Sequence, residues 1–175
     1  MRQLTNFVLM NGSHTRFQEI VRTYQQPLYW YVRRQVLVHE VAEDILQETF
    51  LKAYRHLWQL RSEASLRPWL FRIATNEVNR HFKKRRMTVP QEEIPEDGLA
   101  SAVEMAEEGE TEKRASEVIS AAILEMSPLQ RQVFCLKYYE EMDYEGISRI
   151  TGASKNTLMV SYHQARKKIE KEIMK

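Results

Sequence analysis

The fold of this chain is decided by residues 127–169, which read SPLQRQVFCLKYYEEMDYEGISRITGASKNTLMVSYHQARKKI. Ser127 and the proline after it are typical of a helix N-cap with proline at the first helical position. Asp143 can cap a short helix, and Gly152 can adopt the positive φ of the turn that ends this helix. Ser154 can cap a last helix. Two helices joined by a tight turn with glycine indicate a helix-turn-helix.

The last helix of this stretch presents residue types that read DNA. In a helix-turn-helix the second helix enters the major groove with its N-terminus first, so its first turns reach base edges. Asn156 can pair with adenine, and Lys155 with guanine or phosphate. Arg166 and Lys167 would meet phosphates. An αα-hairpin with a solvated basic face would show the same pattern, so this alternative stays open.

Helical periodicity continues towards the N-terminus. One apolar stripe predicts a helix from about residue 42, and it is formed by Ala42, Ile45, Leu46, Thr49, Phe50, Ala53 and Leu57. A second stripe predicts a helix from about Ser65 to Arg85, and it is formed by Leu66, Leu70, Ile73, Ala74, Val78 and Phe82. Pro27 lies inside an earlier pattern and predicts a kink or a helix break there.

The composition favours an all-α chain. Five glycines and five prolines in 175 residues are few for the many turns of an all-β fold. Residues 87–116 carry 9 Asp/Glu against 2 Lys/Arg, together with prolines, glycines and few large apolar side chains. We predict two small helical domains joined by this acidic flexible linker, of which residues 99–108 could instead form a weak helix.

Cysteine, histidine and hydropathy patterns exclude several classes of protein. The single cysteine, Cys135, lies in an apolar run, which predicts a small buried side chain and a reducing compartment. The five histidines show no metal spacing, so we predict no metal and no cofactor. No apolar run approaches the ~20 residues of a membrane helix, and no signal-peptide cleavage site follows the N-terminus. We therefore expect a cytoplasmic protein.

The helix predicted near residues 65–85 has a second, basic face. Its members are Arg72, Asn76, Asn79, Arg80 and Lys83. Trp58 and Trp69 lie close in sequence, and basic residues interleaved with aromatic rings suit single-stranded nucleic acid. Taken alone, each tryptophan fits a core position better, and the basic run over residues 81–86 could be a solvated face.

The other side of the helix that begins near residue 42 is acidic. Its polar members are Glu43, Asp44, Gln47 and Glu48. Carboxylates cannot bind a nucleic-acid backbone favourably, yet residues 1–86 as a whole carry 15 Lys/Arg against 7 Asp/Glu. A protein partner with a basic groove would explain this face. A solvated face is the alternative.

Three blocks in this order and spacing resemble a known family. They are AEDILQETFLKAYRHL (42–57), RPWLFRIATNEVNRHFKKRR (67–86) and the stretch quoted first (127–169). Together they closely resemble the extracytoplasmic-function (ECF) type of bacterial RNA polymerase sigma factor. The resemblance covers about residues 15–86 and 117–173, and its first block is the most specific, because many regulators share a helix-turn-helix.

This resemblance implies a factor that binds core RNA polymerase and directs promoter-specific initiation. It assigns residues 13–86 to region 2, which docks on polymerase and melts and reads the −10 element, 87–116 to the linker, and 117–175 to region 4, which reads the −35 duplex. The implied polymerase contacts are Asp44, Gln47, Glu48 and Phe50. The implied −10 contacts are the flipped-base loop, Ser62, Glu63, Ala64 and Ser65, and then Trp69, Arg72, Asn76, Asn79, Arg80 and Lys83. The implied −35 contacts are Ser154, Lys155, Asn156, Thr157, Met159, His163, Arg166 and Lys167.

The resemblance also implies partners. Core polymerase and promoter DNA are expected, and so is an anti-sigma factor, because family members are often held by one that is anchored in the membrane. No catalytic residue is expected, and the chain is predicted not to be an enzyme.

The sequence departs from the family at a few positions. Basic residues usual in the family are absent at Met159, Ser161 and Gln164, which predicts weaker −35 affinity. Gly146 stands inside a predicted helix, where glycine lowers the stability of the helix by about 1 kcal/mol relative to alanine.

Two other functions compete with that of a sigma factor. A stand-alone helix-turn-helix regulator with a sensor domain would not need the acidic face. A metal-dependent nuclease built on the same carboxylates would need a further ligand cluster.

Overall fold

The computed structural model describes the backbone of residues 2–60, 62–88, 118–123 and 125–174, and the side chains of 15–60, 62–85, 118–123 and 125–174. The helices are α1 (Arg2–Val36), α2 (His39–His56), α3 (Leu66–Thr88), α6 (Pro128–Tyr138), α7 (Tyr144–Thr151) and α8 (Lys155–Ile173). Residues 118–123 are also helical. Two 3-10 turns, η1 (Leu57–Gln59) and η2 (Glu63–Ser65), connect α2 to α3. The described chain contains no strand, which confirms the all-α prediction, whereas the predicted linker lies outside the described residues apart from the end of α3.

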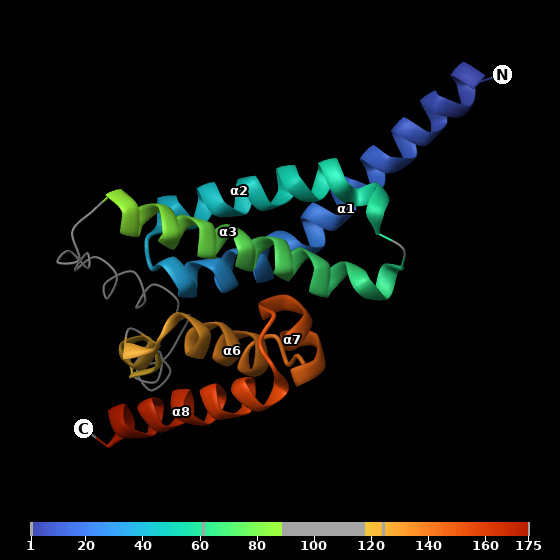
Figure 1. The fold of residues 1–175 in the computed structure, drawn as a ribbon. Helices are drawn as coiled ribbons and strands as arrows, with labels where there is room; N and C mark the ends of the chain where they lie inside the picture. Colours follow the sequence, from blue (N-terminus) through green and yellow to red (C-terminus); the bar gives the residue numbers. More distant parts are fainter. Residues whose placement is uncertain (1, 61, 89–117, 124, 175) are drawn as a thin grey trace, which may run out of the picture.

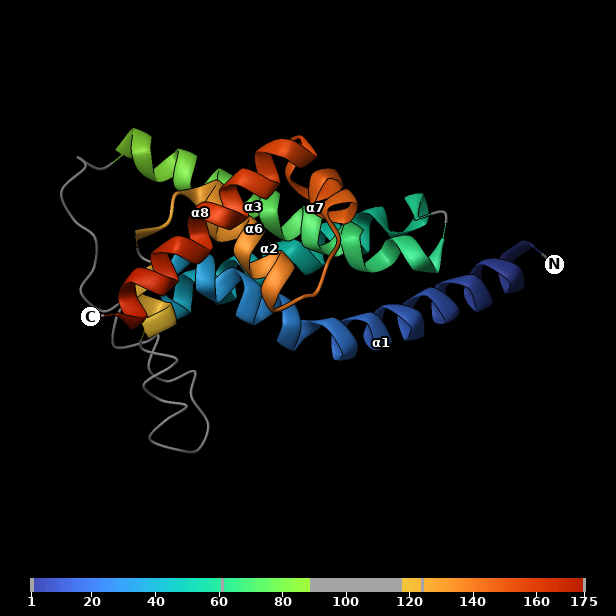
Figure 2. The ribbon, with the colours of Figure 1, turned by 90° about the horizontal axis from the view of Figure 1, so that it is seen from below.

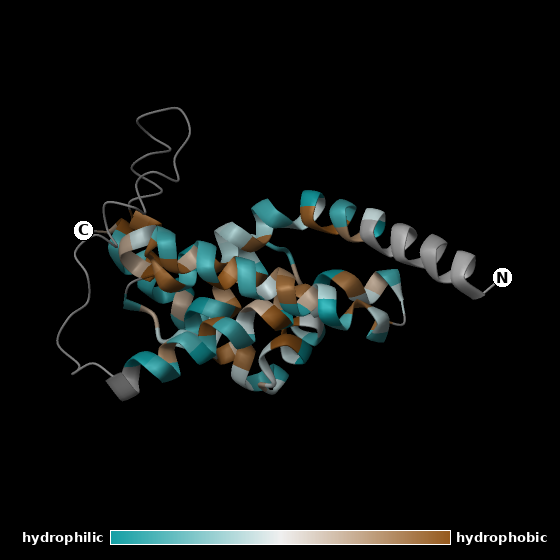
Figure 3. Ribbon diagram, turned by 90° about the horizontal axis from the view of Figure 1, so that it is seen from above, coloured by the Kyte–Doolittle hydropathy of each residue, from teal (hydrophilic) through white to brown (hydrophobic). Residues whose placement is uncertain are grey.

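The helices form two layers (Figure 1). Helices α1, α2 and α3 make the N-terminal layer, and α6, α7 and α8 make the C-terminal layer. The layers touch, because α3 lies against α7 and α1 lies against α6. Seen from below, the C-terminal layer lies in front of the N-terminal layer, and the start of α1 extends beyond both (Figure 2). Hydrophilic and hydrophobic residues both occur within single helices, as expected for amphipathic elements (Figure 3).

The N-terminal layer is built on the two predicted apolar stripes. The fully buried members are Ala42, Ile45, Thr49 and Ala53 in α2 and Leu66, Leu70, Ala74 and Val78 in α3, and the remaining members are half-buried. Helix α1 adds Tyr31, whose ring meets Phe71 edge to face at 5.3 Å between centroids. The Tyr31 hydroxyl shares a hydrogen bond of 2.7 Å with Thr75. Burial raises the pKa of Tyr31, so the hydroxyl stays protonated inside this core.

A kink or a helix break was predicted at Pro27; helix α1 runs through Pro27 without ending, so of these two the break does not occur. Proline costs about 3 kcal/mol inside a helix. Leu28, Tyr31 and Val32 lie within the next five residues and are buried. Burial of each such side chain stabilises the fold by roughly 1.5–3 kcal/mol. The free energy gained by packing this segment therefore exceeds the cost of the proline.

The C-terminal layer confirms the predicted caps. Ser127 forms a capping box with Gln130, and Ser154 accepts a hydrogen bond of 3.2 Å from the Thr157 amide. Gly152 has φ of 76°, the left-handed conformation that its turn requires. The layer closes over Phe134, Leu136, Ile147, Leu158 and Ala165, all of them buried.

The structure gives a reason for glycine at position 146 that the sequence did not reveal. It lies in the first turn of α7, and its amide donates a 2.7 Å hydrogen bond to the capping Asp143 carboxylate. A Cβ added at Gly146 would lie 3.0 Å from the same Asp143 oxygen. Glycine therefore allows the cap to approach closely, which offsets its low helix propensity.

Two features of the described residues bear on the class of protein. None of the helices in this part of the chain combines the length and the hydropathy that crossing a bilayer requires. Within the same residues, no three His, Cys, Asp or Glu side chains gather in a group that could hold a metal ion.

Candidate functional site

The acidic face of α2 consists of Glu43, Asp44, Gln47 and Glu48, and all four side chains are exposed. They are exposed because the apolar stripe of α2 faces the core and helical geometry turns these positions away from it. Leu51 and Tyr54, also exposed, continue the face by one and two turns at intervals of three residues. The sequence analysis missed these two, although exposed apolar residues in register with the acidic ones were a usable signal.

Phe50 differs from the other predicted polymerase contacts. It is half-buried, and its ring meets Phe17 of α1 edge to face at 6.3 Å. Tyr54 meets the same Phe17 ring at 5.0 Å. Phe17 therefore orients both rings at the margin of the acidic face.

The loop before α3 contains Ser62, Glu63, Ala64 and Ser65, and all four are exposed. Residue 61 lies outside the described part. Arg16 of α1 donates to the Glu63 carboxylate at 2.5 Å, an ion pair that connects the loop to the first helix. This exposed pair orients the loop more than it stabilises the fold.

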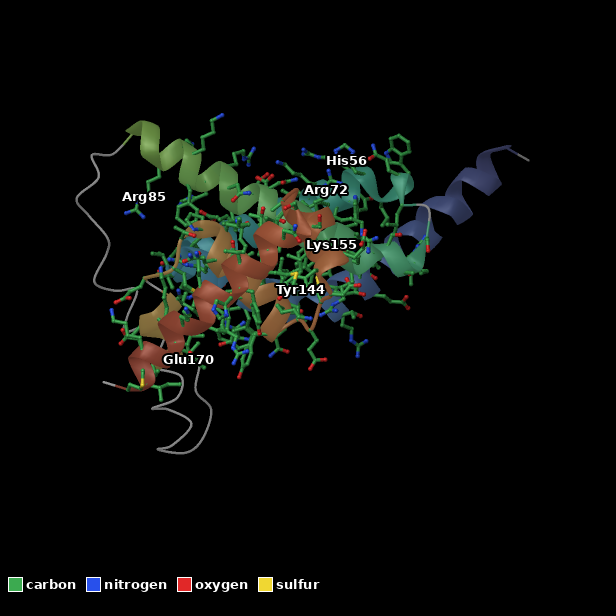
Figure 4. The ribbon with its side chains drawn as sticks, turned by 60° about the horizontal axis from the view of Figure 1, so that its bottom comes forward. His56, Arg72, Arg85, Tyr144, Lys155 and Glu170 are labelled. Atoms are coloured by element: carbon green, nitrogen blue, oxygen red, sulfur yellow. The ribbon has the colours of Figure 1, made fainter. Side chains whose placement is uncertain are left out.

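The basic face of α3 consists of Arg72, Asn76, Asn79, Arg80 and Lys83, all exposed as predicted. Arg72 and Arg85 mark widely separated points along α3 in Figure 4. His81 lies among these bases. Its pKa is lowered by partial burial and by the neighbouring Arg85 and Lys84, because all three disfavour a further positive charge.

A buried carboxylate organises this face. Glu77 is only 5% exposed, and it pairs with Arg80 at 2.5 Å and with Lys52 of α2. A charge that is buried to this degree requires partners. Glu77 therefore links α2 to α3 and holds the Arg80 guanidinium at one place on the surface.

A shallow hollow of about 400 Å³ lies between α2 and α3. Its lining residues are Lys52, His56, Gln59, Trp69, Ile73, Asn76 and Glu77. The half-buried Trp69 thus takes part both in packing and in a concave surface. Sequence reasoning found Trp69 and Asn76 but missed the residues from α2 and η1, because only the tertiary fold brings them to α3.

Trp58 corrects one prediction. Taken alone it fitted a core position better, but its side chain is 79% exposed. Its indole nitrogen donates to the Arg55 carbonyl at 3.1 Å, so one hydrogen bond and the position in η1 hold the ring outwards. The Trp58 side chain is exposed because of the direction in which the chain leaves the end of α2. The sequence pattern did not reveal this direction.

The recognition face lies on α8 and the turn before it. All eight predicted members are exposed: Ser154, Lys155, Asn156, Thr157, Met159, His163, Arg166 and Lys167. Leu158, Ser161 and Ala165 on the other side are buried. The face is therefore free of core packing over three turns, and Lys155 lies at its beginning (Figure 4).

Several members of the recognition face already have partners within the chain. The Ser154 and Thr157 hydroxyls share a hydrogen bond of 2.9 Å. Lys155 pairs with Glu145 of α7. Arg166 lies 3.6 Å from Glu170 one turn further on. Such exposed pairs are weak and can exchange for phosphates.

Family models match both halves of the chain. Sigma-70 region 2 matches residues 20–88, and sigma-70 region 4 matches residues 116–169. The chain is 28% identical to the ECF RNA polymerase sigma factor SigW of Bacillus subtilis over 171 residues, which span 93% of this chain and 91% of SigW. It is 26% identical to the sigma factor YlaC of the same organism over 159 residues, with 90% and 92% covered.

Solved structures share the fold. The sigma factor RpoE of Bartonella quintana, in complex with the anti-sigma factor NepR, matches with a TM-score of 0.74 at 20% identity, covering 90% of this chain and 96% of that one. CnrH, in complex with the cytosolic domain of CnrY, matches with a TM-score of 0.62 at 19% identity, covering 90% and 86%. With both sigma-70 regions present in order and relatives matched over nearly their full length, the chain belongs to the ECF sigma factors.

Proposed function

We propose that this chain docks on core RNA polymerase through α2, holds melted −10 DNA on α3 and reads the −35 duplex with α8. The observation that supports this most directly is that the acidic face of α2, the basic face of α3 and the recognition face of α8 are all exposed opposite buried stripes. The α2 face carries carboxylates, as a basic protein groove requires. The α3 and α8 faces carry bases and amides, as DNA requires.

Transcription in vitro tests this proposal. The purified chain, added to bacterial core polymerase and a promoter library, is expected to produce start sites that core polymerase alone does not use. Sequencing the transcript ends would show a shared −10 and −35 element. A folded protein that redirects the polymerase to no start site would contradict the proposal.

The surface of α3 suits single-stranded DNA in the −10 element. Unstacking a base costs roughly a few kcal/mol unless the base gains a pocket. The 400 Å³ hollow offers the Trp69 ring for stacking and the Asn76 amide for hydrogen bonds. Arg72, Arg80 and Lys83 lie exposed on the same helix face and supply charge for the phosphates.

Replacing Asn156 by alanine is expected to lower discrimination at the −35 element by about 1–3 kcal/mol, because an amide that pairs with adenine is lost. Asn156 is exposed in the first turn of α8, so the fold should not change. The measurement is initiation by the holoenzyme from a set of promoters that differ only in the −35 element.

Lys167→Ala is the matched comparison on the same helix. Lys167 is exposed further along α8 and is proposed to contact phosphate. Its loss should weaken initiation equally on all promoters in the set. An Asn156→Ala variant that also weakens all promoters equally would argue against base reading by Asn156.

Three further properties belong to the proposal. An anti-sigma factor is a proposed partner, since the structural relatives RpoE and CnrH were solved with NepR and with CnrY. The chain is proposed to work in the cytoplasm, where core polymerase works. It is proposed to be a regulatory subunit without catalysis of its own.

A further inference from the structure

Two apolar side chains are exposed in the first two turns of α8, in the middle of the recognition face. Met159 is 53% exposed and Val160 is 58% exposed. Within the described residues, neither belongs to the hydrophobic core or to the half-buried apolar side chains that pack against it. Valine is also a weaker helix former than alanine or lysine. Core packing and helix propensity therefore give no reason for apolar residues at these two positions.

The same two side chains are neighbours of residues that can hydrogen-bond to bases. Met159 and Val160 follow Asn156 by three and four positions, and they precede His163 by four and three. Residues at these spacings lie side by side on a helix surface. All four side chains are exposed. They therefore form one surface patch, which we call the reading patch.

The three positions of α8 that lack the family's usual basic residue have different surroundings. Ser161 is only 8% exposed. The side-chain oxygen of Gln164 accepts a hydrogen bond of 2.7 Å from Gln130 of α6. Ser161 and Gln164 thus contribute to the packing of α8 in the C-terminal layer. Met159 makes no such contact with the described core, so its side chain is available to a ligand.

The positive charges of the recognition face lie outside the reading patch. Lys155 precedes the patch in sequence, and Arg166 and Lys167 follow it. The only titratable side chain within the patch is that of His163. Phosphate contacts need positive charge or polar donors, whereas sequence is read on the base edges. The centre of the recognition face is therefore suited to base edges.

The major groove offers one apolar feature to such a patch, the 5-methyl group of thymine. Removing a group of this size from water changes a binding constant by about fourfold. Four residues of helix rise by about 6 Å, and stacked base pairs are about 3.4 Å apart. Val160 therefore comes within about two base pairs of a base that Asn156 contacts.

A protein surface is the rival occupant of the patch. Exposed apolar patches that mark protein interaction sites usually extend over several hundred Å². Met159 and Val160 are only two side chains, and the flanking Asn156 and Lys155 suit DNA. These neighbours favour a base edge over a protein partner.

Resting on the proposed function, we propose that Met159 and Val160 read the 5-methyl group of thymine in the −35 element. The element then contains a thymine, on one strand or the other, within about two base pairs of the adenine that Asn156 contacts. Part of the sequence preference of this chain comes from an apolar contact that is insensitive to salt, because no charge takes part in it.

Uracil tests the proposal, because it differs from thymine only by the missing 5-methyl group. Holoenzyme, assembled from the full-length chain and core polymerase, is titrated onto promoters from the library in which single −35 thymines of either strand are replaced by uracil. The apparent affinity of the wild type should fall about fourfold at one or two of these positions. Uracil in the spacer between the two elements should change nothing.

Met159→Gln and Val160→Ser replace the apolar surface by polar groups at exposed positions. Each variant should bind the thymine promoter more weakly and reduce the difference between thymine and uracil, and the double variant should abolish this difference. Lys167→Ala is the matched control on the same helix. It should weaken binding to both promoters equally and leave their ratio unchanged. Circular dichroism and a pull-down with core polymerase accompany each variant.

Equal affinity of the wild type for thymine and uracil promoters would overturn the proposal and leave the proposed function intact. A −35 element without thymine would do the same, and so would a double variant that keeps the wild-type ratio. If the double variant is folded but no longer binds core polymerase, the patch contacts protein and the proposal is wrong. A holoenzyme that starts at no promoter would contradict the proposed function itself, and the proposal with it.

Discussion

Replacing Asp44 and Gln47 together by arginine is expected to abolish binding of the chain to core RNA polymerase. Both side chains are exposed on the acidic face of α2 and contribute nothing to its buried stripe. Two arginines there would meet a basic partner groove, and like charges at an interface cost several kcal/mol. The measurement is a pull-down with core polymerase, with circular dichroism to show that the fold is intact.

Gln18→Arg with Glu19→Arg is the matched control. It makes the same change of charge at two exposed positions of α1. This variant should bind polymerase as the wild type does. If the α2 variant is still pulled down at the wild-type level, α2 is not the docking helix.

Replacing Phe71 by alanine is expected to lower the free energy of unfolding by about 3–5 kcal/mol, the range for large-to-small changes of a buried aromatic side chain. Phe71 is fully buried, and it packs against Tyr31 in the centre of the N-terminal layer. Urea denaturation, followed by circular dichroism, would measure the change.

Arg72→Ala provides the contrast, because Arg72 is the next residue and is exposed. It should change the free energy of unfolding by no more than about 0.5 kcal/mol while it weakens initiation. A Phe71→Ala chain that is as stable as the wild type would mean that this core is not packed as described.

Local signals in the sequence were sufficient for the helices and their ends. Ser127, Asp143 and Ser154 cap the helices that they were predicted to cap, because capping depends on residues three positions away. Gly152 adopts the predicted left-handed conformation. The apolar stripes identified the buried side of α2 and α3, and so also the polar sides on which the candidate contacts lie.

What the sequence did not reveal depends on contacts between distant segments. The hollow beside Trp69 needs Lys52 and His56 from α2, about 15 residues earlier in the chain. The pairing of Arg67 with Glu140 joins residues that are 73 positions apart. No periodicity encodes such pairs, since each partner alone reads as an ordinary surface charge.

The outward indole of Trp58 gives the chain an optical signal of its own. The other two tryptophans, Trp30 and Trp69, are half-buried. Trp58 is the most exposed of the three, so solvent relaxation lowers the energy of its excited state the most. Its emission should lie at the red end of the spectrum of this chain. A base or a protein surface that covers the ring would shift or quench that light, and titrations with DNA or polymerase could be followed without any label.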